Sequence, residues 1–208
     1  MAITSTTGAI PTASTSSAAA APANPLDGFA KVHHMRKGEH YFFYCKPEET
    51  DPPKLYQHIL GLAEHEVWVW DPHFHVVDAS VFAAITHPGV AIKMMARPSN
   101  ITLPAYKSGC VTAMDTHMNA TIKTGCTLTI VQAKGDGFKS WLTHDRFLIV
   151  DKQKVFLMGA SVGYYLNQGE STGAYEITDS VDKDLIIKAF EYYWTQLDTG
   201  TNVEHHSF

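Results

Sequence analysis

Cysteine is scarce in this sequence of 208 residues, which contains only three of them. Cys45, Cys110 and Cys126 are widely spaced and form no C-x-x-C pair, so nothing indicates a zinc knuckle or a disulfide framework. An isolated thiol commonly behaves as a small apolar side chain inside a protein. We therefore expect buried cysteines in a reducing compartment, and a cytoplasmic location.

Long apolar runs and an excess of positive charge are absent as well. No apolar run approaches the roughly 18–20 residues that a membrane-spanning helix needs, so we expect no membrane anchor. The formal net charge is −5 and the isoelectric point is near 6.1, which gives no overall attraction to nucleic acid or acidic lipid. Binding of nucleic acid would therefore require a local basic cleft.

Charged side chains are missing altogether from the first 25 residues, which are almost entirely Ala, Ser, Thr, Pro and Gly. The segment has neither the basic start nor the compact apolar core of a secretory signal. It buries too little apolar surface to offset its conformational entropy. We predict a disordered tail over residues 1–25, one domain over 26–199, and a flexible C-terminal tail over 200–208.

Within the predicted domain, apolar residues recur at strand spacing and at helix spacing in turn. The predicted strands cover residues 40–45, 66–71, 90–96 and 126–132, and a further pair lies within 141–161. The predicted helices begin at Pro52, cover 79–86 and 104–123, and follow a cap at Asp179. Strands that alternate with helices predict an α/β fold: a single domain with a mixed, mostly parallel β-sheet and helices on both faces.

The strand pair carries an unusual set of polar residues, in the run HDRFLIVD (144–151). His144 and Arg146 lie two apart on a strand, so their side chains project from the same face, and Asp151 follows the strand. A histidine can attack phosphorus, a guanidinium can neutralise charge on the phosphoryl oxygens, and a carboxylate can orient the imidazole. The simpler interpretation is a structural ion pair between Arg146 and a neighbouring aspartate, Asp145 or Asp151.

The order of several features resembles the phospholipase D superfamily. The run HDRFLIVD is similar to its motif, in which His-x-Lys is followed by four residues and Asp. GAS (159–161) stands where the family has Gly-Ser-x-Asn, and AYE (174–176) stands where it has Asn-x-Glu before a closing helix. Upstream, VWVWDPHF (67–74) resembles the strand that leads into Asp-Pro in many members with one motif.

The resemblance implies a metal-independent phosphodiesterase without a cofactor. His144 would form a phosphohistidine, while Arg146 and Ser161 would bind phosphate oxygens. Asp151 and Glu176 would orient or tune the histidines. Because family catalysis uses two motifs and this chain has one, the resemblance implies a homodimer in which the second His144 protonates the leaving oxygen.

Departures from the family pattern support an alternative, a catalytically silent domain that serves binding or dimerisation. Arg146 keeps the charge of the family's lysine but replaces a compact ammonium with a planar fork. Gly163 stands where the motif has asparagine, and Asn167 could take that place only through a rearranged loop. Ala174 replaces the second asparagine, so two donors to phosphate oxygens are lost.

A third hypothesis, a metal-dependent hydrolase, comes from the segment DPHFHVVD (71–78). His73 and His75 after a buried strand resemble the metal-binding start of amidohydrolase barrels, with Asp71 and Asp78 as further oxygen ligands. That barrel normally needs about 250 residues, and too little chain follows here. A loop in which His73 contacts substrate fits the segment better than a metal site, and a purely structural role, such as a hydrogen bond between His73 and the backbone, is the simplest interpretation.

Among phosphodiester substrates we favour nucleic acid, single- or double-stranded, over phospholipid. Members of the family with one motif are often nucleases. The sequence also contains no amphipathic helix suited to a lipid interface.

Overall fold

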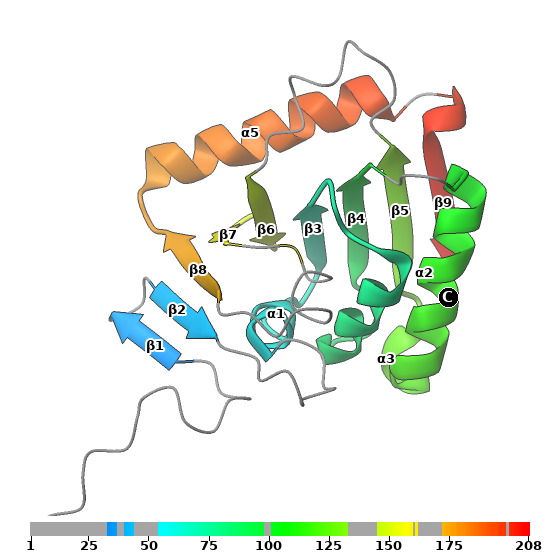
Figure 1. The fold of residues 1–208 in the computed structure, drawn as a ribbon, viewed down its shortest axis with the longest axis horizontal. Coiled ribbons are helices and arrows are strands. Elements are labelled where there is room, and N and C mark those ends of the chain that lie inside the picture. Colours follow the sequence, from blue (N-terminus) through cyan, green and yellow to red (C-terminus); the bar gives the residue numbers. More distant parts are fainter. Residues whose placement is uncertain are drawn as a thin grey trace, which may run out of the picture.

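The computed structural model describes residues 33–36, 40–43, 54–97, 101–132, 145–159, 161, 172–198 and 200–208. These residues build one nine-stranded sheet in the order β1-β2-β8-β7-β6-β3-β4-β5-β9 (Figure 1). The strands are β1 (His33–Arg36), β2 (His40–Phe43), β3 (Glu66–Trp70), β4 (Ala91–Ala96), β5 (Thr127–Gln132), β6 (Arg146–Val150), β7 (Lys154–Met158), β8 (Thr172–Ile177) and β9 (Val203–Ser207).

The sheet is mixed, as predicted, but it is not mostly parallel. Of the eight strand pairings among the described residues, only β3–β4 and β4–β5 are parallel. Parallel neighbours need a crossover connection, and helical segments supply one after β3 and another after β4. The tight turn between β6 and β7, in contrast, makes an antiparallel pair, as do the pairings of β8, β2 and β1 beside them.

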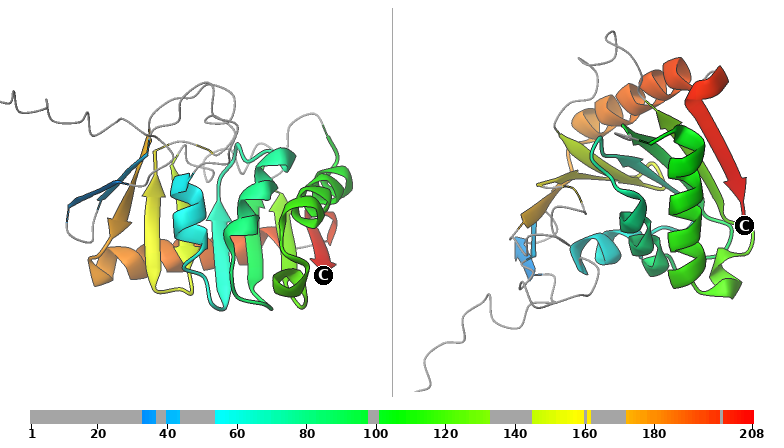
Figure 2. Two further views of the ribbon diagram at one scale, coloured as in Figure 1. Left: turned by 90° about the horizontal axis from the view of Figure 1, so that it is seen from below. Right: turned by 45° about the vertical axis from the view of Figure 1, so that its right-hand side comes forward.

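Helices cover both faces of the sheet, which confirms the predicted layers (Figure 2). One face carries α1 (Lys54–Leu60), the 3-10 helix η1 (Val76–Ala84), α2 (Leu103–His117) and α3 (Ala120–Lys123). The other face carries α5 (Ser180–Leu197), which buries Phe190 and Leu197 against Trp68 and Trp70. Cys110 and Cys126 lie in the core of the first face, and Cys45 lies outside the described residues.

Two predicted helices differ from those in the structure. The helix predicted over 104–123 ends at His117, because the side chain of Asn119 accepts hydrogen bonds from the backbone N–H groups of Thr121 and Ile122 and so starts α3 anew. The helix predicted over 79–86 is the 3-10 segment η1. The Asp179 cap is confirmed: its carboxylate accepts from the N–H groups of Val181 and Asp182.

The predicted flexible tail over 200–208 is wrong, because residues 203–207 form β9 along the edge of β5. A short 3-10 turn, η3 (Gly200–Asn202), leads into it. The backbone N–H of Phe208 donates to the carbonyl of Cys126, and His205 Nδ1 lies 3.1 Å from Thr129 Oγ1. An isolated edge strand of polar residues carries little sequence signal, since its partner strand supplies the hydrogen bonds.

The predicted disordered tail over residues 1–25 lies outside the described residues. Among the helices of the described chain, none is long and apolar enough to cross a membrane.

Candidate functional site

Three strands bring polar side chains to one edge of the sheet. Asp71 directly follows β3, Arg146 opens β6, and Ser161 comes shortly after β7. β6 runs antiparallel to both neighbours, with Phe147 opposite Trp70 and Arg146 opposite Met158. The start of β6 therefore lies beside the ends of β3 and β7. This is also the edge at which the parallel strands β3, β4 and β5 end, the usual place for ligand sites in open α/β sheets.

A chain of hydrogen bonds joins these three side chains. The Nε–H of Arg146 donates to Ser161 Oγ over 2.5 Å, and the Ser161 hydroxyl donates to Asp71 Oδ1 over 2.7 Å. Arg146 Nε also lies 3.8 Å from Asp71 Oδ1. Ser161 is only 4% exposed and Asp71 only 2% exposed, whereas the side chain of Arg146 keeps 20% of its surface accessible. Ser161 therefore holds the Nε edge of a guanidinium that remains partly accessible.

Asp71 is the buried end of this chain. Burial raises the pKa of its carboxyl, and hydrogen bonds from the Ser161 hydroxyl and the backbone N–H of His73, together with the charge of Arg146, oppose that rise. The His73 N–H lies 2.9 Å from Oδ1, while Oδ2 has no hydrogen-bond partner among the described residues. The carboxyl group therefore fixes the orientation of Ser161, and through it that of Arg146.

Sequence reasoning considered Asp71 only as a metal ligand and missed this role. The available signal was its position immediately after a strand that is buried on both faces. An aspartate does lie near Arg146, as the ion-pair interpretation predicted, and the one that the structure places 3.8 Å from its Nε is Asp71. The partner comes from β3, 75 positions away in the chain.

Two predicted site residues, His144 and Asn167, lie outside the described residues. Their roles therefore stay predictions. His73 lies beside the site through its backbone, since its N–H binds Asp71, and its side chain is exposed. Contact between the His73 side chain and substrate remains a proposal.

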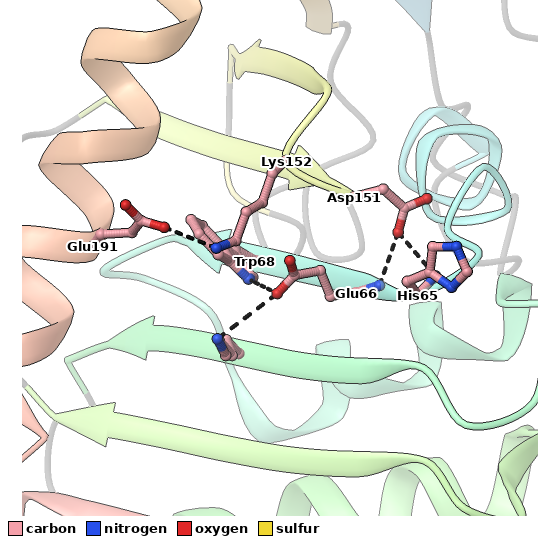
Figure 3. Close-up of polar contacts among 7 residues, drawn as sticks. His65, Glu66, Trp68, Asp151, Lys152 and Glu191 are labelled. Carbon is pink, nitrogen blue, oxygen red and sulfur yellow. Dashed lines mark hydrogen bonds and ion pairs between the residues drawn. The ribbon is translucent and has the colours of Figure 1, made fainter.

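Asp151 is not brought to Arg146 and Ser161. Arg146 begins β6 and Asp151 follows its last residue, so the two residues lie at opposite ends of the strand. At about 3.3 Å per residue, their backbones are about 16 Å apart. The carboxylate of Asp151 instead accepts three backbone hydrogen bonds, one from Glu64 at 3.0 Å. The other two come from His65 at 2.9 Å and Glu66 at 2.8 Å (Figure 3). Asp151 therefore joins the β6–β7 turn to the connection between α1 and β3.

The network beyond Asp151 belongs to this opposite end of the sheet. Trp68 Nε1 donates to Glu66 Oε2 over 2.7 Å, and Lys152 Nζ lies 2.8 Å from Glu191 Oε1 on α5 (Figure 3). Lys152 Nζ also lies 4.8 Å from the centre of the Trp68 ring, at cation–π distance. Of these contacts, the one between Lys152 and Glu191 joins the β6–β7 turn to α5.

Asp151→Ala is expected to lower the free energy of unfolding by about 1–2 kcal/mol, because three backbone N–H groups lose their acceptor. Burial alone would raise the pKa of Asp151, but the bonds from Glu66, Glu64 and His65 outweigh burial and the net pKa is lowered from 3.8. The carboxylate's contribution is therefore present above about pH 4 and lost as pH falls through the lower, folded pKa. Urea unfolding at several pH values measures both effects.

Asp198→Ala serves as the matched control, because Asp198 is an exposed aspartate that follows α5. The interpretation fails if the two variants lose equal stability, or if the loss in Asp151→Ala is unchanged between pH 7 and pH 3.

Glu176 lies farther along the sheet than predicted. It stands on β8 opposite Phe156, whereas the row that contains Arg146 passes through Met158 to Ala174. At about 4.8 Å between strands, Glu176 is two strands away from Arg146 and displaced by two residues along β8. Its carboxylate lies 3.5 Å from Lys154 Nζ. The residue in the Arg146 row is Ala174, which is 4% exposed and has no polar side chain.

The metal-hydrolase alternative has no geometric basis in the described residues. The side chains of His73 and His75 are exposed. Asp78 Oδ2 accepts the backbone N–H of His75 at 2.7 Å, where it helps to start η1, and Asp71 binds Ser161. No group of three or more His, Cys, Asp or Glu side chains in this part of the chain is arranged to hold a metal ion.

Comparison with known proteins gives likenesses of structure only. No family model matches the chain, and no curated protein matches its sequence. Among solved structures it is similar to Nuc from Salmonella typhimurium, described as a phospholipase D family member, with 16% identity, a TM-score of 0.48, and coverage of 82% of this chain and 100% of that one. It is also similar to NucT from Helicobacter pylori, with 15% identity, a TM-score of 0.47, and coverage of 78% of this chain and 98% of that one. Phosphatidylserine synthase from Haemophilus influenzae is 12% identical, with a TM-score of 0.42 and coverage of 80% of this chain and 39% of that one. All three TM-scores lie below one half.

Proposed function

We propose that this chain is a phosphodiesterase of the phospholipase D type that cuts nucleic acid as a homodimer. The observation that carries the proposal is the chain of hydrogen bonds from Asp71 through Ser161 to Arg146. It holds a guanidinium at the carboxyl edge of the sheet, two residues from His144 in a run that resembles the family motif.

The reaction proceeds in two displacements. The imidazole of His144 attacks phosphorus, one P–O bond breaks, and His144 of the partner subunit gives a proton to the leaving oxygen. Water then attacks the phosphohistidine and the P–N bond breaks. The deprotonated histidine of the partner takes the proton of that water, so the product is a phosphomonoester and both imidazoles return to their first state.

Arg146 stabilises the negative charge that develops on the phosphoryl oxygens. Its Nε edge is occupied by Ser161, so the outward edge of the guanidinium is the one presented to a phosphate. The buried Asp71 holds that orientation in advance, which avoids reorganisation when the charge develops. Asp71 and Ser161 are therefore positioning residues, and Arg146 is the group that meets the phosphate.

The homodimer and the nucleic-acid substrate follow from simple requirements. A single chain supplies one His144, and the reaction needs both a nucleophile and an acid. A twofold dimer supplies the second histidine. Nucleic acid is favoured over phospholipid because no interfacial helix is predicted from the sequence.

Hydrolysis of a bis-aryl phosphodiester and of single-stranded DNA, measured with and without EDTA, tests the proposal. We expect turnover of both substrates at rates that EDTA leaves unchanged, and a dimer by light scattering. Loss of turnover in EDTA would contradict the histidine mechanism, because His144 and Arg146 need no metal. A monomer that remains fully active would contradict the shared site.

The alternative of a silent domain has one observation in its favour. Ala174 occupies the row of Arg146 in the sheet, is buried, and offers no amide to a phosphate oxygen. Absence of turnover with either substrate, in a folded dimer, would support this second function.

A further inference from the structure

A cavity of about 610 Å³ opens at the same edge of the sheet as the Arg146 site. It lies where β5 ends, where α2 begins and where η3 leads into β9. Its lining combines apolar side chains with a few polar ones. Among the lining residues are Ile101, Leu103, Pro104, Gln132 and Glu204. None of them takes part in the proposed hydrolysis.

Among the lining residues, Gln132 is the one whose side chain indicates a bound ligand. Its side chain is only 8% exposed, yet its Oε1 atom has no hydrogen-bond partner among the described residues. A buried polar atom without a partner costs free energy, on the order of 1–3 kcal/mol, so such atoms are uncommon unless something binds them. The unpartnered atom is an acceptor, and its complement is an N–H or O–H donor.

The strand register connects Gln132 to the Arg146 site. Gln132 is opposite Ala96 on β4, and Met95 is opposite Trp70, so Asp71 continues the row of Ala96 and Gln132. Side chains two apart on these strands share the face that packs under α2. Arg146 on β6 continues the same row, and with strands about 4.8 Å apart its backbone lies three spacings, about 14 Å, from that of Gln132. The side chains of Arg146 and Gln132 shorten the gap that a nucleotide has to span between its phosphate and the edge of its base.

We propose that this cavity binds a nucleobase with N–H donors on its edge, best represented by guanine, of the nucleotide beside the scissile phosphate. The proposal rests on the proposed nucleic-acid phosphodiesterase function. Ile101, Leu103 and Pro104 offer apolar surface to the faces of a base, and Gln132 Oε1 accepts from its edge. The first turn of α2 supplies backbone N–H groups for an acceptor of the base.

The charge of Glu204 favours a neutral base over a second phosphate as the ligand of this cavity. Its carboxylate lines the cavity and pairs with Lys107 of α2, with 2.9 Å between Nζ and Oε2. The pair leaves no net positive charge beside the helix terminus, although a phosphate would require one. A neutral base with amino and imino donors is compatible with both Gln132 and Glu204.

Gln132→Leu keeps the approximate size of the side chain but removes the amide. It therefore tests base binding without changing the residues proposed to catalyse hydrolysis. We expect cleavage of a single-stranded DNA of alternating guanine and thymine to fall about five- to tenfold. Hydrolysis of the bis-aryl phosphodiester, which has no base, should be unchanged. Gln196→Leu, an exposed glutamine on α5, is the matched control and should alter neither rate. Equal rates on both substrates in Gln132→Leu and wild type would overturn the subsite and leave the hydrolase intact.

Binding measured by NMR tests the subsite even in a chain without turnover. We expect guanosine 5′-monophosphate to shift the side-chain amide signal of Gln132, which the Gln132→Leu spectrum identifies, and ribose 5-phosphate to leave it in place. If both compounds leave that signal unmoved, the cavity holds only water and the proposal is wrong. A shift with the nucleotide but no hydrolysis would keep the subsite and remove the catalytic function.

Discussion

Replacing His144 with alanine is expected to lower kcat for both phosphodiester substrates by at least about a thousandfold, as loss of a nucleophile does in other covalent mechanisms. The change removes the atom that attacks phosphorus and, in the dimer, also the atom that protonates the leaving oxygen. Neither Arg146 nor Ser161 can replace it, because a guanidinium stays protonated and the Ser161 hydroxyl donates to Asp71. Steady-state rates on the bis-aryl phosphodiester measure the loss.

His87→Ala is the control for this variant. His87 is exposed and precedes β4, at the edge of the sheet opposite the site. A His144→Ala enzyme that keeps more than a tenth of the wild-type rate would show that this imidazole is neither nucleophile nor acid.

Arg146→Met is expected to reduce kcat by about a hundred- to a thousandfold, the loss typical when a group that stabilises the developing charge is removed. Most of the loss should appear in kcat and little in KM, since the interaction strengthens as charge develops on the phosphoryl oxygens. Arg146→Lys should lose less, because an ammonium keeps the charge but gives up the fixed contact of the guanidinium Nε with Ser161. Kinetics at saturating substrate separate the two variants.

Lys188→Met removes the same charge from an exposed position on α5 and should leave the rate unchanged. Asp71→Asn adds a readout for positioning: it replaces the carboxyl group that accepts from Ser161 with an amide, so its loss should be partial and fall mainly on kcat. Equal losses in Arg146→Met and Lys188→Met would mean that overall charge matters and that the position of the guanidinium does not.

The parts of the fold that could be predicted are those in which the residues of one element alone indicate how it is buried or capped. The run EVWVW is apolar on both faces because β3 is covered on both, and Asp179 caps α5 with its own carboxylate. In the site, the spacing of Arg146 and Ser161 within one hairpin could be predicted from the family motif. The structure brings these two side chains together.

Partners that lie far away in the sequence could not be predicted. Asp71 meets Ser161 across 90 positions, and Asp151 meets the backbone of Glu66 across 85, so no local pattern marks either contact. The predicted catalytic role of Asp151 assumed that motif residues act at one place. A strand of five residues instead separates the ends of the motif, and the aspartate serves the connection between α1 and β3. β9 likewise depends on β5 for its hydrogen bonds.

The most direct measurement is a search for the covalent intermediate. Wild-type protein is mixed with a large excess of the bis-aryl phosphodiester, quenched within the first turnover in alkaline denaturant, where a phosphohistidine persists, and digested for mass spectrometry. The account predicts an aryl phosphate mass on the peptide that contains His144, and its absence from His144→Ala. Turnover without any adduct, or an adduct on a different residue, would contradict it.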